Sequence, residues 1–113
     1  MRKEFDFIGE RDIPSEAYYG IHSIRAKENF PDTMAFHIEW YKALGTVKKA
    51  CYLTIKHFFS EINTKFPDHK WPIQPVDQDI IDLLIRTAEG VESGQWFDQF
   101  IVPAVQGGAG TIN

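Results

Sequence analysis

The 113-residue chain lacks several features that define common classes of protein. Cys51 is its one cysteine, which excludes an internal disulfide and a cysteine-rich zinc site and suits a reducing cytosol. Its apolar runs are far shorter than the roughly 20 residues needed to span a bilayer. No apolar stretch follows the charged start Met-Arg-Lys-Glu, so no secretory signal is visible. We therefore expect a cytoplasmic protein with no membrane partner.

Clustered positive charge is also scarce. The net charge is −4, and no stripe of Lys and Arg extends beyond the pair Lys48-Lys49. Binding to phosphate backbones requires a clustered basic face, so nucleic acid is a poor candidate partner. Low-complexity segments and internal repeats are absent. Aromatic residues, in contrast, are plentiful, with nine Phe, four Tyr and three Trp, and such a chain can bury a core rather than remain disordered.

The first 30 residues contain one weak strand pattern and one ambiguous stretch. Phe5 and Phe7 alternate with acidic residues, which predicts a short strand or hairpin within residues 3–13, with a turn at Gly9. Residues 15–18 predict a short helical turn that ends at Gly20. The pattern of residues 21–30 favours no single element.

The strongest pattern predicts a long amphipathic helix that ends before Pro67. Apolar residues recur at spacings of three and four, as expected for one helix face: Trp40, Leu44, Val47, Cys51, Ile55, Phe58 and Ile62. We expect Asp32 or Thr33 to cap its start and Cys51 to be a buried thiol on this face. Gly45 interrupts the pattern and is interpreted as a site where another helix approaches closely.

A second amphipathic helix is predicted after a proline-containing connector at residues 67–75. Its apolar positions are Val76, Ile80, Leu84, Ala88 and Val91. Acidic residues near its start suit the helix dipole, and Gly90 and Gly94 bracket its end. The apolar segment 97–105 then leads into a glycine-dense loop that ends the chain. Such an end, and a helix that is apolar over a wide arc, indicate packing partners outside this chain.

Three stretches resemble a known family of lyases. Residues 13–30 read IPSEAYYGIHSIRAKENF, residues 47–50 read VKKA, and residues 98–111 read DQFIVPAVQGGAGT. Together they resemble, in order and over nearly the whole chain, the aspartases of the aspartase/fumarase superfamily. The continuation Gly-Ile-His in the first stretch and Gly-Gly-Ala-Gly-Thr in the last favour aspartase over fumarase. The family pattern Gly-Thr-Ser-x-Asn is replaced here by Gly110-Thr111-Ile112-Asn113, in which the serine is missing.

The resemblance implies a mainly α fold: a short β hairpin, a long helix and a second amphipathic helix. Residues 1–113 would form a single N-terminal lyase domain, without the central helical bundle and the C-terminal domain. The family reaction is the reversible conversion of L-aspartate to fumarate and ammonia, by anti elimination through an aci-carboxylate intermediate. It needs no cofactor, and the family's enzymes are homotetramers whose active sites combine residues from three subunits.

The resemblance also implies a role for the C-terminal loop. The threonine of the aspartase Gly-Gly-Ala-Gly-Thr stretch donates a hydrogen bond to a substrate carboxylate, which assigns substrate binding to Thr111, Gly110 and Gly108. Glycines allow backbone N–H groups to approach an anion closely, and a hydroxyl donates beside them. Without the resemblance, a glycine-rich loop is more often a plain turn.

Arg25 and Arg11 also match arginines of the family and are candidates for contact with a carboxylate or an effector. A structural ion pair with Asp or Glu is the favoured interpretation for both. His22 is interpreted as a packing residue, and the remaining histidines have no metal-ligand spacing, so no metal site is expected. No catalytic residue is assigned, because the family's loop with the catalytic serine has no counterpart here.

Two other functions remain open at this stage. The chain could be a non-catalytic fragment, alone or docked on a separately encoded remainder. It could also belong to a fumarase-type hydratase. Whether the chain is itself an enzyme is left undecided by the sequence.

Overall fold

The computed structural model describes residues 1–68 and 76–107. The chain divides into two compact units. We call Met1–His37 with Trp96–Asn113 the hairpin unit, and Ile38–Gln95 the helical unit. Among the described residues, no helix has the length and apolar character required to cross a bilayer. The predicted mainly α fold with one hairpin and two amphipathic helices is confirmed, and the single-domain assignment stays a prediction.

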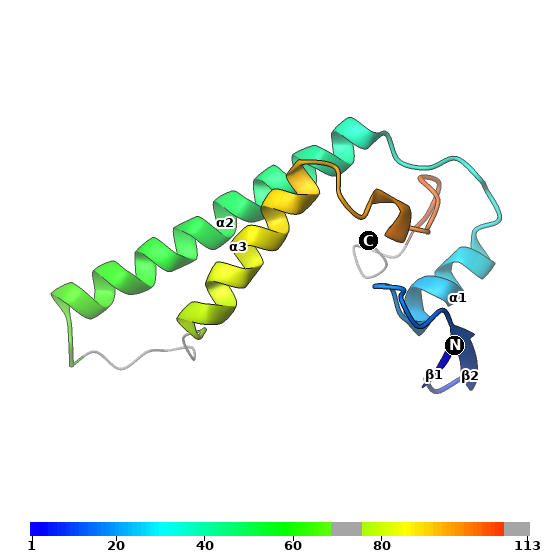
Figure 1. Ribbon diagram of the computed structural model, residues 1–113, viewed down its shortest axis with the longest axis horizontal. Coiled ribbons are helices and arrows are strands. Elements are labelled where there is room, and N and C mark those ends of the chain that lie inside the picture. The colour runs from blue at the N-terminus through cyan, green and yellow to red at the C-terminus, as the bar shows by residue number, and fades with distance from the viewer. Residues whose placement is uncertain (69–75, 108–113) are drawn as a thin grey trace. The chain divides into compact units, whose positions relative to one another are not determined.

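The hairpin unit begins with two antiparallel strands, β1 (Arg2–Phe5) and β2 (Glu10–Ile13), as predicted (Figure 1). The turn lies at residues 6–9, because the Asp6 side chain accepts hydrogen bonds from the backbone N–H groups of Ile8 (2.9 Å) and Gly9 (3.1 Å). Gly9 has φ +144°, a conformation that residues with a side chain rarely adopt. Ile13 at the end of β2 is fully buried.

The ambiguous stretch forms helix α1 (Ile21–Asn29), which buries Ile21 and Ala26. Its first turn is capped by a residue of β1, because Glu4 Oε1 accepts a hydrogen bond from Ile21 N–H at 3.0 Å. A carboxylate at this end is favoured by the helix dipole. A Cβ at Gly20 would lie 2.9 Å from Glu4 Oε1, so a larger residue at this position would displace the capping carboxylate.

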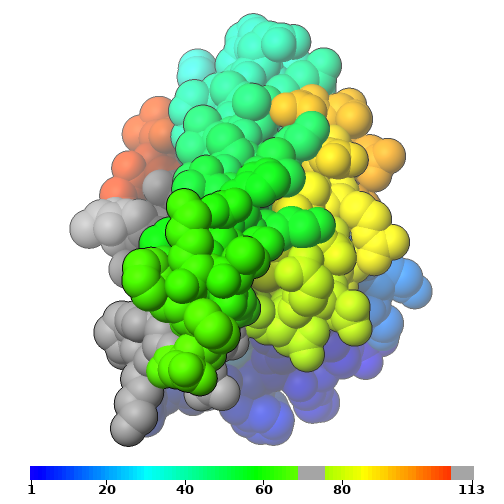
Figure 2. All heavy atoms as spheres, turned by 90° about the vertical axis from the view of Figure 1, so that its left-hand side faces the viewer, coloured from blue at the N-terminus to red at the C-terminus, as the bar shows by residue number. Residues whose placement is uncertain are grey.

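The helical unit is an antiparallel pair of α2 (Ile38–Lys65) and α3 (Gln78–Glu92), which lie side by side in Figures 1 and 2. Their closest approach is at Gly45, where an added Cβ would lie only 2.5 Å from the backbone nitrogen of Glu92. The predicted role of Gly45 is therefore confirmed. Tyr41, one turn earlier, is buried and its hydroxyl donates to the Gln95 carbonyl.

Polar pairs extend this contact along both helices. Lys56 Nζ lies 2.8 Å from Asp82 Oδ1, and Thr46 Oγ1 donates to Glu92 at 2.6 Å. Lys49 Nζ also reaches Glu92, at 3.5 Å. These hydrogen bonds lower the pKa of both Asp82 and Glu92. The side of α2 that packs on α3 is therefore partly polar.

The side of α2 predicted to be the packed face is largely exposed. Val47 is 58% exposed and Ile55 36%, and Cys51 between them is exposed, so the prediction of a buried thiol was wrong. The period of four along the sequence identified a helix face correctly. It did not identify which face α3 covers, because Gly45 and the polar pairs determine that contact.

Smaller differences concern the helix ends. Helix α2 starts at Ile38, so neither Asp32 nor Thr33 is its N-cap, and Asp32 instead accepts a hydrogen bond from Met34 N–H at 2.7 Å. Asp77 caps α3, accepting from Asp79 N–H. The residues of α3 that are buried are Ile81, Ile85 and Ala88, whereas the predicted positions Val76 and Ile80 are exposed.

Candidate functional site

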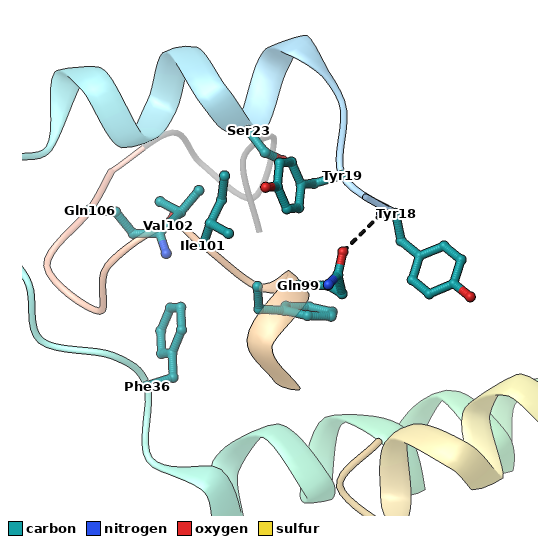
Figure 3. Close-up of a pocket in the computed structure, with 9 residues that line it drawn as sticks. Tyr18, Tyr19, Ser23, Phe36, Gln99, Ile101, Val102 and Gln106 are labelled. Carbon is teal, nitrogen blue, oxygen red and sulfur yellow. Dashed lines mark hydrogen bonds between the residues drawn. The ribbon is translucent and has the colours of Figure 1, made fainter. Parts of the chain in front are cut away.

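The first and last of the family-like stretches meet inside the hairpin unit. The side chain of Gln99, in the 3₁₀ turn η1 (Phe97–Gln99), accepts a hydrogen bond from Tyr18 N–H at 2.9 Å (Figure 3). The rings of Tyr18 and Trp96 meet edge to face, with centroids 6.3 Å apart. Ala104 N–H donates to the Met34 carbonyl at 2.8 Å. Residues distant in sequence are thus held together in one small region.

A pocket of about 220 Å³ lies at this junction. In Figure 3, Ser23 projects into it from α1, Tyr19 from the loop before α1, and Phe36 from the opposite side, whereas the Tyr18 ring points away. The segment after η1 completes the lining with Gln99, Phe100, Ile101, Val102 and Gln106.

The described lining of this pocket is mostly apolar and carries no charged side chain. A dicarboxylate requires cationic or clustered N–H partners, so this lining alone does not form a dicarboxylate site. Gln106 donates from its amide nitrogen to the Pro103 carbonyl at 3.0 Å. Its buried Oε1 accepts no hydrogen bond from the described part of the chain.

Arg25 is held in an ion pair on the other side of α1. Its guanidinium donates to both carboxylate oxygens of Asp6, at 2.5 and 2.9 Å, and both side chains are about nine-tenths buried. The hydrogen bonds from Arg25 lower the pKa of Asp6 to about 2. The ion pair favoured from sequence is present, and it ties the hairpin turn to α1.

Arg11 is paired in a similar but more exposed arrangement. Its guanidinium donates to Glu28 at 3.1 Å, and these hydrogen bonds raise the pKa of Arg11. Both candidate arginines are thus engaged by carboxylates of the chain itself. Contact of either with a substrate or effector carboxylate stays a prediction.

The predicted substrate-binding residues Thr111, Gly110 and Gly108 lie outside the described residues. Gly107, immediately before them, is exposed and has open space where a Cβ would point. His22 and His57 are exposed. In residues 1–68 and 76–107, no cluster of three His, Cys, Asp or Glu side chains is arranged to hold a metal ion.

Two structural residues were missed by sequence reasoning, and both are in β1. Arg2 donates to Glu4 at 2.9 Å and to four loop carbonyls, those of Pro14, Ser15, Ala17 and Tyr19. Glu4 in turn caps α1, and its hydrogen bonds with Arg2 and Ile21 lower its pKa. Arg2 therefore fixes the loop that carries Tyr18 and Tyr19. A charged residue in an alternating strand pattern does not indicate that its side chain binds the carbonyls of a distant loop.

The fold of this chain is similar to that of solved fumarate lyases. Two solved structures described as fumarate lyase:delta crystallin from Brucella melitensis, one in native form and one bound to cobalt, align with 98–99% of this chain. Their TM-scores are 0.70 and 0.71, the sequence identities are 35% and 33%, and the alignment covers 22% of those chains. No protein-family model matches the chain.

Curated sequences point to one branch of that superfamily. Aspartate ammonia-lyase from a Bacillus species is 40% identical over 112 residues, and that from Bacillus subtilis is 38% identical over 111. A third, from Helicobacter pylori, is 39% identical over 114 residues. The chain belongs to the aspartase/fumarase superfamily and matches its aspartate ammonia-lyases. It spans about a fifth of the length of these relatives.

Proposed function

We propose that this chain is the N-terminal part of an aspartate ammonia-lyase and supplies a loop that binds a substrate carboxylate. The observation that carries the proposal is the 40% identity over 98% of the chain to an aspartate ammonia-lyase of which it spans 21%. The loop is the Gly108-Gly110-Thr111 stretch. The proposed substrates are L-aspartate and fumarate, the assembly a homotetramer and the location the cytoplasm, all as in the family that the sequence resembles.

In this proposal the chain contributes to binding and not to proton transfer. Elimination at aspartate places extra negative charge on one carboxylate as the C3 proton leaves. Hydrogen-bond donors fixed around that carboxylate stabilise the transition state, in which this charge develops, more than they stabilise the bound substrate. The Thr111 hydroxyl and neighbouring backbone N–H groups are such donors. The base would come from the serine-bearing loop that the resemblance places in the rest of the subunit.

The described residues support a chain that is inactive by itself. Both arginines that match the family are paired with Asp6 and Glu28, and the pocket in the hairpin unit has no charged lining. A complete dicarboxylate site therefore needs cationic groups from elsewhere. The experiment is an ammonia-release assay with L-aspartate on the chain alone and with the part of the Bacillus subtilis enzyme that lies outside the match.

We expect no ammonia from the chain alone and measurable ammonia from the mixture. Ammonia release by the chain alone would contradict the proposal. If the two parts bind each other and the mixture stays inactive, the chain is a non-catalytic docking partner.

A second candidate function is fumarate hydration. It is favoured by the likeness to structures described as fumarate lyase, at TM-scores of 0.70 and 0.71. The same mixture is therefore supplied with fumarate in the absence of ammonia, and malate is measured. Malate formation without aspartate deamination would replace the first proposal by the second.

A further inference from the structure

Helix α2 carries a second apolar face that α3 does not use. Val47, Cys51 and Ile55 follow one another at intervals of four residues and all remain exposed, Val47 at 58% and Ile55 at 36%. We call these three residues the α2 row. Residues four apart lie on one face of a helix and form the ridges through which helices pack.

The α2 row is distinct from the contact with α3. That contact is made at Gly45, beside the Glu92 backbone, and through the pair Lys56–Asp82 at 2.8 Å. Gly45 precedes Cys51 by six residues, which places it about a third of a turn away around the axis. The row therefore remains open while the α2–α3 contact is complete.

The comparisons indicate what the row meets. The chain aligns as a whole, at a TM-score of 0.71, with 22% of a fumarate lyase chain, and it spans 21% of an aspartate ammonia-lyase. Because the fold of this piece is preserved, the other four-fifths of such a subunit must meet it at surfaces that the piece leaves open. An exposed apolar row on a 28-residue helix is such a surface.

We propose that the α2 row docks an apolar helix from the part of the lyase subunit that has no counterpart in this chain. This inference rests on the proposed function and names its partner surface. The small Cys51 between two β-branched residues allows a helix to approach closely at the centre of the row. A second copy of this chain is a weaker candidate, because three side chains bury far less than the roughly 800 Å² per partner of a stable dimer.

Cys51 is itself the reporter for this contact, because it is the one cysteine of the chain and is exposed. The chain is treated with iodoacetamide, and its alkylation is followed by intact mass spectrometry, alone and with the Bacillus subtilis remainder. We expect alkylation to slow at least tenfold in the complex and to be independent of the concentration of the chain alone. Unchanged alkylation in a complex that forms and releases ammonia would overturn the docking inference and leave the proposed function intact.

Protection that grows with the concentration of the chain alone would assign the row to a second copy and overturn the inference. If the separate parts do not associate, the same alkylation is measured on a fusion. In this fusion the chain replaces the matching 111 residues of the Bacillus subtilis enzyme. In the folded fusion, Cys51 must be protected, and free alkylation overturns the inference whether or not ammonia is released.

Substitutions provide a matched comparison. Val47→Glu with Ile55→Glu places two charges on the row, whereas His57→Glu with Ser60→Glu places two charges on exposed positions of α2 that lie at least a third of a turn from the middle of the row. We expect the first pair to weaken binding of the remainder at least tenfold and the second pair to leave it within twofold. Equal effects of the two pairs would contradict the docking inference.

Discussion

At the scale of single residues, charged side chains of the hairpin unit are used to hold backbone in place. Arg2 fixes the loop before α1, Glu4 caps α1, and Asp6 shapes the turn while pairing with Arg25. All three interactions depend on ionised groups. The hairpin unit is therefore expected to depend on pH more strongly than a unit built on apolar contacts alone.

The first prediction concerns acid stability. The pKa of Asp6 falls from 3.8 to about 2 on folding. Ionised Asp6 therefore contributes to the free energy of unfolding above pH 3.8, and this contribution is lost as the pH falls towards 2. Asp6→Asn should therefore be less stable than the parent chain near neutral pH, and the two should converge near pH 2. The free energy of unfolding of Asp6→Asn and of the parent chain is measured by urea unfolding at several pH values, followed by circular dichroism. Parallel stability curves for Asp6→Asn and the parent chain would show that the Asp6–Arg25 pair does not contribute.

The second prediction concerns Gly45. Alanine there gains helix propensity of about 1 kcal/mol but places a Cβ 2.5 Å from the Glu92 nitrogen. We expect a net loss of about 1–3 kcal/mol in the free energy of unfolding, because two helix backbones must separate. Gly107→Ala is the control, since nothing lies within 4 Å of its added Cβ. Thermal unfolding of both variants gives the comparison, and an unchanged Gly45→Ala midpoint would refute the close contact.

At the scale of elements, the first and last of the three family-like stretches, residues 13–30 and 98–111, stabilise one another. The Gln99 side chain accepts from Tyr18 N–H at 2.9 Å and so joins η1 to the loop before α1. Trp96 packs its ring on Tyr18 from a left-handed backbone conformation, with φ 62°, that is unusual for a residue other than glycine. The pocket depends on these contacts, because its lining is drawn from both elements.

The third prediction tests this link. Gln99→Leu removes the acceptor for Tyr18 N–H and should cost about 1 kcal/mol in the free energy of unfolding. Gln99→Glu keeps an oxygen acceptor of similar length and should cost less. Amide hydrogen exchange at Tyr18 provides a local measurement, and we expect faster exchange in Gln99→Leu alone. Equal exchange rates in both variants would mean that the bond is absent in solution.

The sequence predicted elements better than their contacts. The hairpin, the long helix ending before Pro67 and the second helix follow from local periodicity and turn residues, and the structure has all three. The face of α2 that meets α3 was mispredicted, because one glycine and several cross-helix polar pairs determine it. Arg2 was missed for a similar reason: its five hydrogen bonds reach residues up to 17 positions away. The binding loop at Thr111 was inferred from family resemblance alone and stays a prediction.

At the scale of the whole molecule, the chain is a folded piece with surfaces that its own length does not cover. The exposed α2 row and the Arg25 guanidinium that is already paired with Asp6 both favour a site completed by residues outside positions 1–113. The relatives that it matches are about five times longer. A complete catalytic centre is therefore expected in the assembled protein.

The fourth prediction concerns the loop in that assembly. Thr111→Val keeps the shape of the side chain and removes the hydroxyl, so it should lower kcat/KM for L-aspartate about 10²-fold or more in the assembled protein. Thr111→Ser keeps the hydroxyl and should retain most of the activity. Binding of the remainder should be the same for both variants, which separates a substrate contact from an assembly defect. Equal kcat/KM values for Thr111→Val and the parent chain would exclude the proposed contact.

The central claim is that this chain completes a lyase that neither part forms alone. Ammonia release from L-aspartate is measured while the chain is titrated into a fixed amount of the Bacillus subtilis remainder. We predict no release by either part alone and a rise that saturates at one chain per remainder subunit. Release by the chain alone, or by the remainder without the chain, would contradict the account.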